Sequence, residues 1–250
     1  GDHLSLHGMS DALIALLKAI NQTPTVIVGH SAGAAIAANM VLREARLSNA
    51  HLIGLNPAWL PLPGVPAWIF GPAAKLAALN PLSAWATTRF AKKPGVIAKW
   101  VAQTGSQLAP DGLDLYRSVF THSGHVHSVL GMMAAWQLSG LSEALPRLKN
   151  EVTILAGSND KTIPIALAHA ACRAMPQTQL IIQDGLGHLA RAAVGIAAGR
   201  IRADPDDGFG WVFVLCQRGQ GQQGGGTRSL HQGSAFHGCL PQEYEQEKSS

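Results

Sequence analysis

"TVIVGHSAGAAIAANMVL", residues 25–42, passes from a strand-like run through a short glycine-flanked turn into a helix-like run. Residues 25–28 are all β-branched, as is common in a buried strand, and the alanines after Gly33 favour a helix. Gly29 and Gly33 carry no Cβ, so the two backbones can approach closely across the turn. A turn of this kind presents its serine at the carboxyl end of a sheet, where open α/β folds bind ligands. Ser31 is therefore a candidate nucleophile, and the alternative is an ordinary serine in a tight turn.

The rest of the chain predicts an α/β fold with a mostly parallel sheet. Short aliphatic runs bounded by Gly, Asn or Pro are typical of parallel strands, and they occur at 51–56, 152–157 and 179–183. Residues 10–20 have apolar side chains at helical spacing, with Ser10 as the expected N-cap. The alternation of strands and helices predicts a sheet flanked by helices.

The chain divides into three regions by pattern. Residues 58–146 hold proline-punctuated helical stretches and no strand candidate, so we expect a helical cap inserted into an α/β core of residues 1–57 and 147–198. Residues 199–250 have lost apolar periodicity except in "WVFVL" at 211–215. We expect an irregular, disordered tail there.

Composition and charge favour a soluble protein of the cytoplasm. The three cysteines are far apart and form no Cys-x-x-Cys pair, so neither a disulfide framework nor a zinc site is expected. No apolar run reaches the length of a membrane span, and no secretory pattern opens the chain. The net charge of +4 is modest, and we interpret the basic cluster at 89–95 as a solvated helix end rather than a surface for nucleic acid or lipid. No cofactor is expected.

A serine hydroxyl needs a histidine base, and an acid to orient that base, before it can act as a nucleophile. Asp160 follows the strand candidate 152–157, and His188 follows the candidate 179–183. Loops at the carboxyl ends of parallel strands can converge, so we expect Ser31, His188 and Asp160 to form a catalytic triad, with the N–H of Ala32 as one oxyanion donor. The alternatives are a helix N-cap for Asp160 and a polar loop residue for His188.

Other candidates carry weaker signals. His30 precedes the serine and is expected to shape the pocket wall. The histidines of "HSGHVH" (122–127) lack a carboxylate or thiolate partner, so surface histidines are favoured over a metal site. Trp59 and Trp136 belong to a stripe of aromatic residues that either lines an apolar substrate pocket or packs the cap; the other members are Trp68, Phe70, Trp85 and Trp100.

Several phrases of the sequence resemble one known family. They are "GHSAGAAIA" (29–37), "LNPAWLPLPG" (55–64), "LNPL" (79–82), "TGSQLAPDGLDLYRSVF" (104–120), "HV" (125–126), "MMAAWQL" (132–138), "LAGSNDKTIP" (155–164) and "GLGHLA" (185–190). Over residues 4–190 the chain is similar to the magnesium-chelatase accessory proteins of bacteriochlorophyll biosynthesis, within the α/β-hydrolase superfamily. The resemblance implies a role beside magnesium insertion into protoporphyrin IX, with magnesium-chelatase subunits as partners.

The chain departs from that family at both ends. The superfamily's opening strands and its His-Gly oxyanion loop have no counterpart before the turn that carries Ser31, since "LHGM" (6–9) leads directly into a helix. We therefore expect the strand at 25–28 to have an exposed apolar edge. After Leu189 the sequence does not continue as the acidic, amphipathic terminal helix typical of the family.

Three functions remain open from the sequence. The first is a serine hydrolase that cleaves an ester or amide held under an apolar cap, in (bacterio)chlorophyll synthesis. The second is a binding accessory without catalysis, which holds a small apolar or porphyrin-like ligand or docks on the chelatase. The third is a general esterase or haloperoxidase-like hydrolase that shares only the triad.

Overall fold

The computed structural model describes residues 3–62, 80–189, 212–215 and 236–238. Its strands form one sheet in the order β5-β1-β2-β3-β4-β6, of which β1 to β4 run parallel. The bounds are β1 Val26–His30, β2 His51–Leu55, β3 Val152–Gly157, β4 Gln179–Gln183, β5 Val212–Leu215 and β6 Phe236–Gly238. β2, β3 and β4 lie within one residue of the bounds that the sequence predicts, because their aliphatic runs are short and sharply terminated. β1 begins one residue later and ends two residues later than the predicted strand at 25–28, because Gly29 and His30 still pair with β2.

Helices cover one face of this sheet. Helices α1 (Leu6–Ala19), α2 (Ala32–Arg43), α8 (Ser139–Ala144) and α9 (Ile165–Ala174) contribute to one buried apolar cluster with residues of β1 to β4. Short 3-10 helices lie at Ala45–Leu47 (η1) and Leu145–Arg147 (η3). On the opposite face of the sheet, Val28, Ile53, Leu55 and Leu155 form a second cluster. Apolar side chains on both faces explain why each parallel strand reads as a continuous aliphatic run.

The first helix begins earlier than its pattern predicts. Ser5 is its N-cap, and the Ser5 hydroxyl accepts a hydrogen bond from the Gly8 N–H at 3.0 Å. Ser10, the predicted cap, is instead buried inside α1, where its hydroxyl donates to the Leu6 carbonyl at 2.7 Å and accepts from Asn39 Nδ2 at 2.8 Å. The prediction was wrong because a serine in a helix can satisfy its hydroxyl on the preceding turn and pack against a neighbouring helix.

The prediction that the strand at 25–28 has an exposed edge is also wrong. β5 pairs with β1 in antiparallel register, Val26 with Leu215 and Val28 with Phe213. β6 pairs with β4 in the same way. Two short parts of the expected irregular tail are therefore strands, and its remaining residues lie outside the described ranges.

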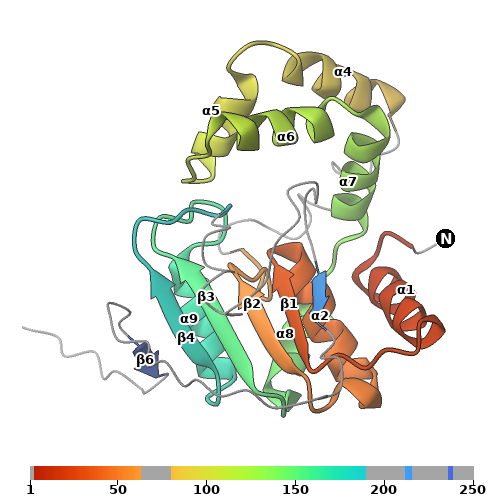
Figure 1. Ribbon diagram of the computed structural model, residues 1–250, viewed down its shortest axis with the longest axis vertical. Coiled ribbons are helices and arrows are strands. Elements are labelled where there is room, and N and C mark those ends of the chain that lie inside the picture. Colours follow the sequence, from red (N-terminus) through yellow and green to blue (C-terminus); the bar gives the residue numbers. More distant parts are fainter. Residues whose placement is uncertain (1–2, 63–79, 190–211, 216–235, 239–250) are drawn as a thin grey trace, which may run out of the picture.

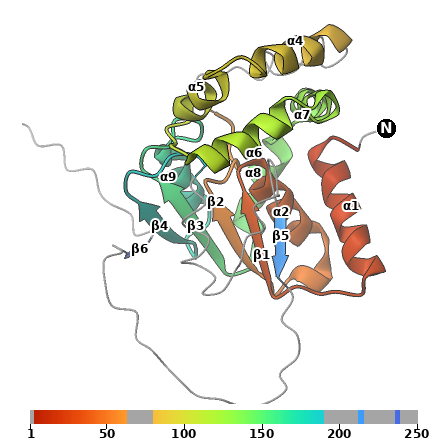
Figure 2. The same cartoon turned by 45° about the horizontal axis from the view of Figure 1, so that its top comes forward.

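A group of helices lies beyond the carboxyl ends of the parallel strands, as Figures 1 and 2 both show. They are α4 (Pro81–Ala91), α5 (Val96–Gln103), α6 (Pro110–Phe120) and α7 (Ser123–Ala135). The described part of the predicted cap, residues 58–62 and 80–146, contains helices and loops and no strand. α8 belongs to the same sequence region, yet Leu141 packs in the sheet core. In the described ranges, no helix combines the length and apolarity that crossing a membrane requires.

Candidate active site

Ser31 occupies a sharp turn between β1 and α2. Its backbone has φ 52° and ψ −120°, a combination that costs energy for a residue with a Cβ and that recurs at functional turns. The surroundings hold it there, because Ser31 N–H donates to the Leu55 carbonyl at 3.0 Å and the Ser31 carbonyl accepts from Ala58 N–H at 3.1 Å. A Cβ on Gly29 would lie 2.5 Å from Ala34 Cα, so only glycine fits where α2 crosses the end of β1.

Asp160 lies in the loop after β3, with its side chain fully buried. Oδ1 accepts hydrogen bonds from the backbone N–H groups of Thr162 at 2.7 Å and Ile163 at 2.8 Å. The N-cap of α9 is Pro164, so Asp160 closes the loop before that helix and is not its cap. These two bonds fix the carboxylate and leave Oδ2 facing His188.

His188 connects the serine with the aspartate. Its Nδ1 lies 2.8 Å from Asp160 Oδ2, and its Nε2 lies 3.0 Å from Ser31 Oγ. The residue is 5% exposed. With Asp160 ionised, Nδ1 carries the proton and Nε2 is left as an acceptor for the serine proton. The structure thus brings together the three residues that the sequence proposed as a triad, in the geometry that nucleophilic catalysis by serine requires.

Ala32 is the first residue of α2. The N–H groups of a first helical turn have no acceptor within the helix and carry the positive end of the helix dipole. The Ala32 N–H is therefore suited to donate a hydrogen bond to negative charge that develops beside Ser31.

His30 contacts the histidine loop itself. Its Nε2 lies 2.8 Å from the His188 carbonyl oxygen, and the two imidazole rings are 4.9 Å apart at their centroids. Its role as a pocket wall stays a prediction, but the observed contact shows that His30 helps to hold the His188 backbone.

Asn56 is a site residue that sequence reasoning missed. It follows β2 with φ 42°, a left-handed conformation that asparagine tolerates better than most residues. Its Nδ2 donates to the carbonyls of Gly187 at 3.2 Å and His188 at 2.9 Å, and its Oδ1 accepts from Gly157 N–H at 2.8 Å. The available signal was an asparagine at the carboxyl end of a strand, next to the strand that leads into the Ser31 turn.

The tryptophans expected to line a pocket occupy different surroundings. Trp59 is fully buried in the sheet core, and its Nε1 donates to the Ala34 carbonyl at 2.8 Å. This position is that of a core residue rather than of a pocket wall. Trp136 ends α7 and packs half-buried against the same core cluster. Trp100 packs between Phe90 and Phe120, Trp85 is 60% exposed, and Trp68 and Phe70 lie outside the described residues.

The histidines at 122–127 lie at the start of α7. His122 is the N-cap, and its Nδ1 accepts from the His125 N–H at 3.3 Å. Burial lowers the pKa of His125, and the neighbouring His122 lowers it further. Among the described residues, no group of histidine, cysteine and carboxylate side chains could hold a metal ion.

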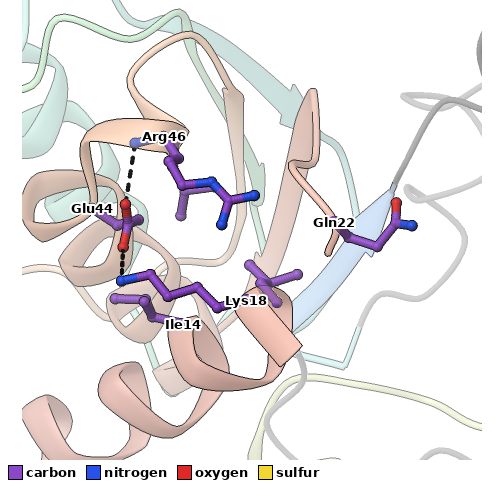
Figure 3. Close-up of a pocket in the computed structure, with 7 residues that line it drawn as sticks. Ile14, Lys18, Gln22, Glu44 and Arg46 are labelled. Carbon is purple, nitrogen blue, oxygen red and sulfur yellow. Dashed lines mark hydrogen bonds and ion pairs between the residues drawn. The ribbon is translucent and has the colours of Figure 1, made fainter. Parts of the chain in front are cut away.

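A shallow hollow lies far from these residues, between α1 and the end of α2 (Figure 3). Lys18 Nζ lies 2.6 Å from Glu44 Oε2, and Glu44 Oε1 accepts from the Arg46 N–H at 3.3 Å. The hydrogen bond from Lys18 holds the pKa of Glu44 below its ordinary value, with a smaller contribution from Arg46. Glu44 caps the carboxyl end of α2, whereas Ser31 precedes its first residue, so the hollow is not part of the candidate site.

Comparisons with known proteins agree on the fold. The model of a family described as "Alpha/beta hydrolase family" matches residues 1–197. The magnesium-chelatase 30 kDa subunit of Rhodobacter capsulatus is 33% identical over 188 residues, which are 75% of this chain and 65% of that protein. The chain therefore spans just under two thirds of the length of this curated relative.

Solved structures of other proteins have a similar fold. A candidate lipase of Acinetobacter baumannii AYE superposes with a TM-score of 0.59 at 17% identity, over 78% of this chain and 66% of that chain. An esterase of Exiguobacterium antarcticum superposes with a TM-score of 0.56 at 15% identity, over 78% and 70%. At these identities the likeness concerns the fold alone. Together the matches confirm the predicted fold class and the resemblance found in the sequence.

Proposed function

Because this chain belongs to the alpha/beta hydrolase family, we propose that it is a serine hydrolase that transfers the acyl group of an ester or amide to water. Ser31 is the nucleophile, His188 the general base and then the general acid, and Asp160 the residue that orients the imidazole. The observation that carries this proposal is the hydrogen-bonded chain from Ser31 through His188 to Asp160.

The order of proton transfers follows from the hydrogen bonds that join Ser31, His188 and Asp160. Ser31 Oγ gives its proton to His188 Nε2 as it attacks the carbonyl carbon, and the Ala32 N–H stabilises the resulting oxyanion. The imidazolium, held by Asp160, then protonates the leaving alcohol or amine. Water repeats the two steps on the acyl-enzyme, so that an acid is released and Ser31 regains its proton.

The setting of the reaction comes from the curated relative. That protein is named as a subunit of magnesium chelatase, so we place this hydrolase at the magnesium insertion step of (bacterio)chlorophyll synthesis. Its substrate class is a small apolar or porphyrin-like ester or amide that reaches Ser31 from the side of α4 to α7.

The same relative favours a second candidate function. The name of that protein is that of a chelatase subunit and not of a hydrolase. In this alternative the chain binds a porphyrin or the chelatase, and the Ser31, His188 and Asp160 arrangement takes no part in chemistry.

Labelling with a fluorophosphonate probe tests the first candidate. The probe reacts with activated serines, so the wild-type chain should be labelled and Ser31→Ala should not, with circular dichroism showing that both are folded. A folded wild-type chain that stays unlabelled contradicts the hydrolase proposal. A titration with protoporphyrin, followed by tryptophan fluorescence, tests the second candidate: equal quenching in both proteins supports a binding accessory, and no quenching contradicts it.

A further inference from the structure

One short segment of the helical region contacts both loops that carry the candidate triad. It consists of Thr104, Gly105 and Ser106, directly after α5, and we call it the bridge segment. Figure 1 shows that α5 belongs to the group α4 to α7, away from the sheet. The bridge segment is therefore where that group meets the loops after β3 and β4.

The first set of contacts is with the loop of His188. The Thr104 carbonyl accepts a hydrogen bond from the His188 N–H at 3.2 Å, and Ser106 Oγ accepts from the Leu189 N–H at 2.9 Å. Ser106, His188 and Leu189 are 5%, 5% and 6% exposed, so water cannot readily replace these bonds. The backbone on both sides of the His188 Cα is thus fixed by the bridge segment.

The second set of contacts is with the loop of Asp160. The same Thr104 carbonyl accepts from the Lys161 N–H at 3.2 Å, and the Gly105 carbonyl accepts from Asn159 Nδ2 at 2.7 Å. Gly105 has φ 80°, and a Cβ there would lie 1.8 Å from the Asn159 carbonyl oxygen. The residues on either side of Asp160 therefore lie directly against the bridge segment.

The hydroxyls of Thr104 and Ser106 complete the arrangement. They lie 2.9 Å apart, and Thr104 Oγ1 lies 2.7 Å from the Val101 carbonyl at the end of α5. Each hydroxyl has one proton to donate. Every group is satisfied if hydrogen bonds run from the Leu189 N–H through Ser106 and Thr104 to Val101, which ties the histidine loop to the helix.

We propose that the bridge segment positions the candidate triad, with Ser106 as its central positioning residue, and thereby makes the distance between Asp160 and His188 depend on helices α4 to α7. Leu189 supplies a second link, because its side chain packs with Ala91, Ile97, Val101 and Tyr116 of those helices. The inference that this positioning serves catalysis rests on the proposed hydrolase function.

The test compares Ser106→Ala with Ser10→Ala. Both substitutions remove a buried hydroxyl that accepts a hydrogen bond from nitrogen, but Ser10 lies between α1 and α2. Fluorophosphonate labelling is resolved into the binding constant KI and the maximal rate kinact. We expect Ser106→Ala to lower kinact on the order of tenfold with KI unchanged, because small displacements of reacting groups are costly. Both substitutions should lower the melting temperature, but Ser10→Ala should keep the kinact of the wild type.

Hydrogen exchange gives a readout that does not depend on catalysis. In Ser106→Ala, peptides covering 158–163 and 185–189 should exchange faster than in the wild type and in Ser10→Ala. Asn159→Ala changes an exposed residue, so we expect the variant to fold, and it should accelerate exchange in 158–163.

The outcomes separate the two proposals. If both loops exchange in Ser106→Ala and in Asn159→Ala at the rates of the wild type, the bridge segment is not a positioning element. A loss of kinact in Ser10→Ala equal to that in Ser106→Ala also overturns the proposal. If the folded wild-type chain is not labelled at all, the hydrolase function fails, and the exchange data still decide whether the bridge segment holds the loops.

Discussion

Asn56 joins three backbone segments of the candidate site through one buried amide. We expect Asn56→Ala to lower the free energy of unfolding by about 2 kcal/mol or more, because the Gly157 N–H and the Gly187 carbonyl lose the hydrogen bonds of Asn56 in the interior, and the His188 carbonyl is left with its contact with His30. It should also slow fluorophosphonate labelling of Ser31, since Asn56 no longer holds the Gly187 carbonyl and the His188 carbonyl loses one of its contacts. Urea denaturation and labelling kinetics measure the two effects.

Asn150 offers a matched control for this substitution. Its Nδ2 also donates to two carbonyls, those of Leu47 and Ala50, and it is 6% exposed, against 5% for Asn56. It lies just before β3, at the opposite end of that strand from Gly157. Asn150→Ala should lose comparable stability and retain the labelling rate. Equal labelling losses in both variants would mean that Asn56 acts only through stability.

Asp160→Asn tests the orientation of the imidazole. The amide oxygen can still accept from Thr162 and Ile163, so the fold should persist, but an amide NH₂ then faces His188 Nδ1. The ring proton moves to Nε2, which can no longer accept the proton of Ser31. Labelling should fall by about 10⁴-fold, as in other serine triads, with an unchanged circular dichroism spectrum. A variant that labels within tenfold of the wild type would exclude this role for Asp160.

Sequence reasoning found Ser31, Asp160 and His188 because each follows a recognisable strand in a loop at one edge of a parallel sheet. Their catalytic role stays a prediction. Sequence reasoning missed Asn56 and Ser106, because their hydrogen-bond partners are backbone groups distant in the sequence, such as those of His188 and Leu189. The position of Asn56 directly after a strand was a local signal, but no feature of the sequence near Ser106 indicates that its partner is a remote backbone group.

Glu44 links α1 to the end of α2 (Figure 3), and its contribution to stability should depend on pH. The folded-state pKa is lowered from 4.5, so the stabilisation is present above 4.5 and is lost as the pH falls through the folded-state value. The free energy of unfolding of the wild type should therefore exceed that of Glu44→Gln at about pH 6 and approach it at about pH 3.

Ionic strength provides the control for that comparison. Lys18 is 55% exposed, so 1 M salt should reduce the difference at about pH 6. A difference that is the same at both pH values would show that the carboxylate charge of Glu44 does not stabilise the α1 to α2 contact.

Individual elements were predictable to different degrees. The parallel strands follow from local aliphatic runs, whereas the start of α1 required a choice between Ser5 and Ser10 that local pattern does not make. The run at 211–215 was visible as apolar, but its antiparallel pairing with β1 joins residues about 185 positions apart. Such a pairing depends on which sheet edge is open in the folded molecule, and no short stretch of sequence carries that information.

Leu189 lies in the loop after β4 and packs against helices α4 to α6, and this contact predicts how the helices and the histidine loop respond together. Leu189 is 6% exposed among side chains of α4, α5 and α6, so Leu189→Ala should cost about 2–5 kcal/mol of unfolding free energy. It should also accelerate hydrogen exchange in α4 to α6. Leu141→Ala removes the same atoms from the sheet core, where Leu141 is 2% exposed; it should cost as much without this local effect. If α4 to α6 exchange alike in the two variants, Leu189 does not anchor the helices to the histidine loop, and among the contacts discussed for the described residues those of the bridge segment are left to connect them to the candidate triad.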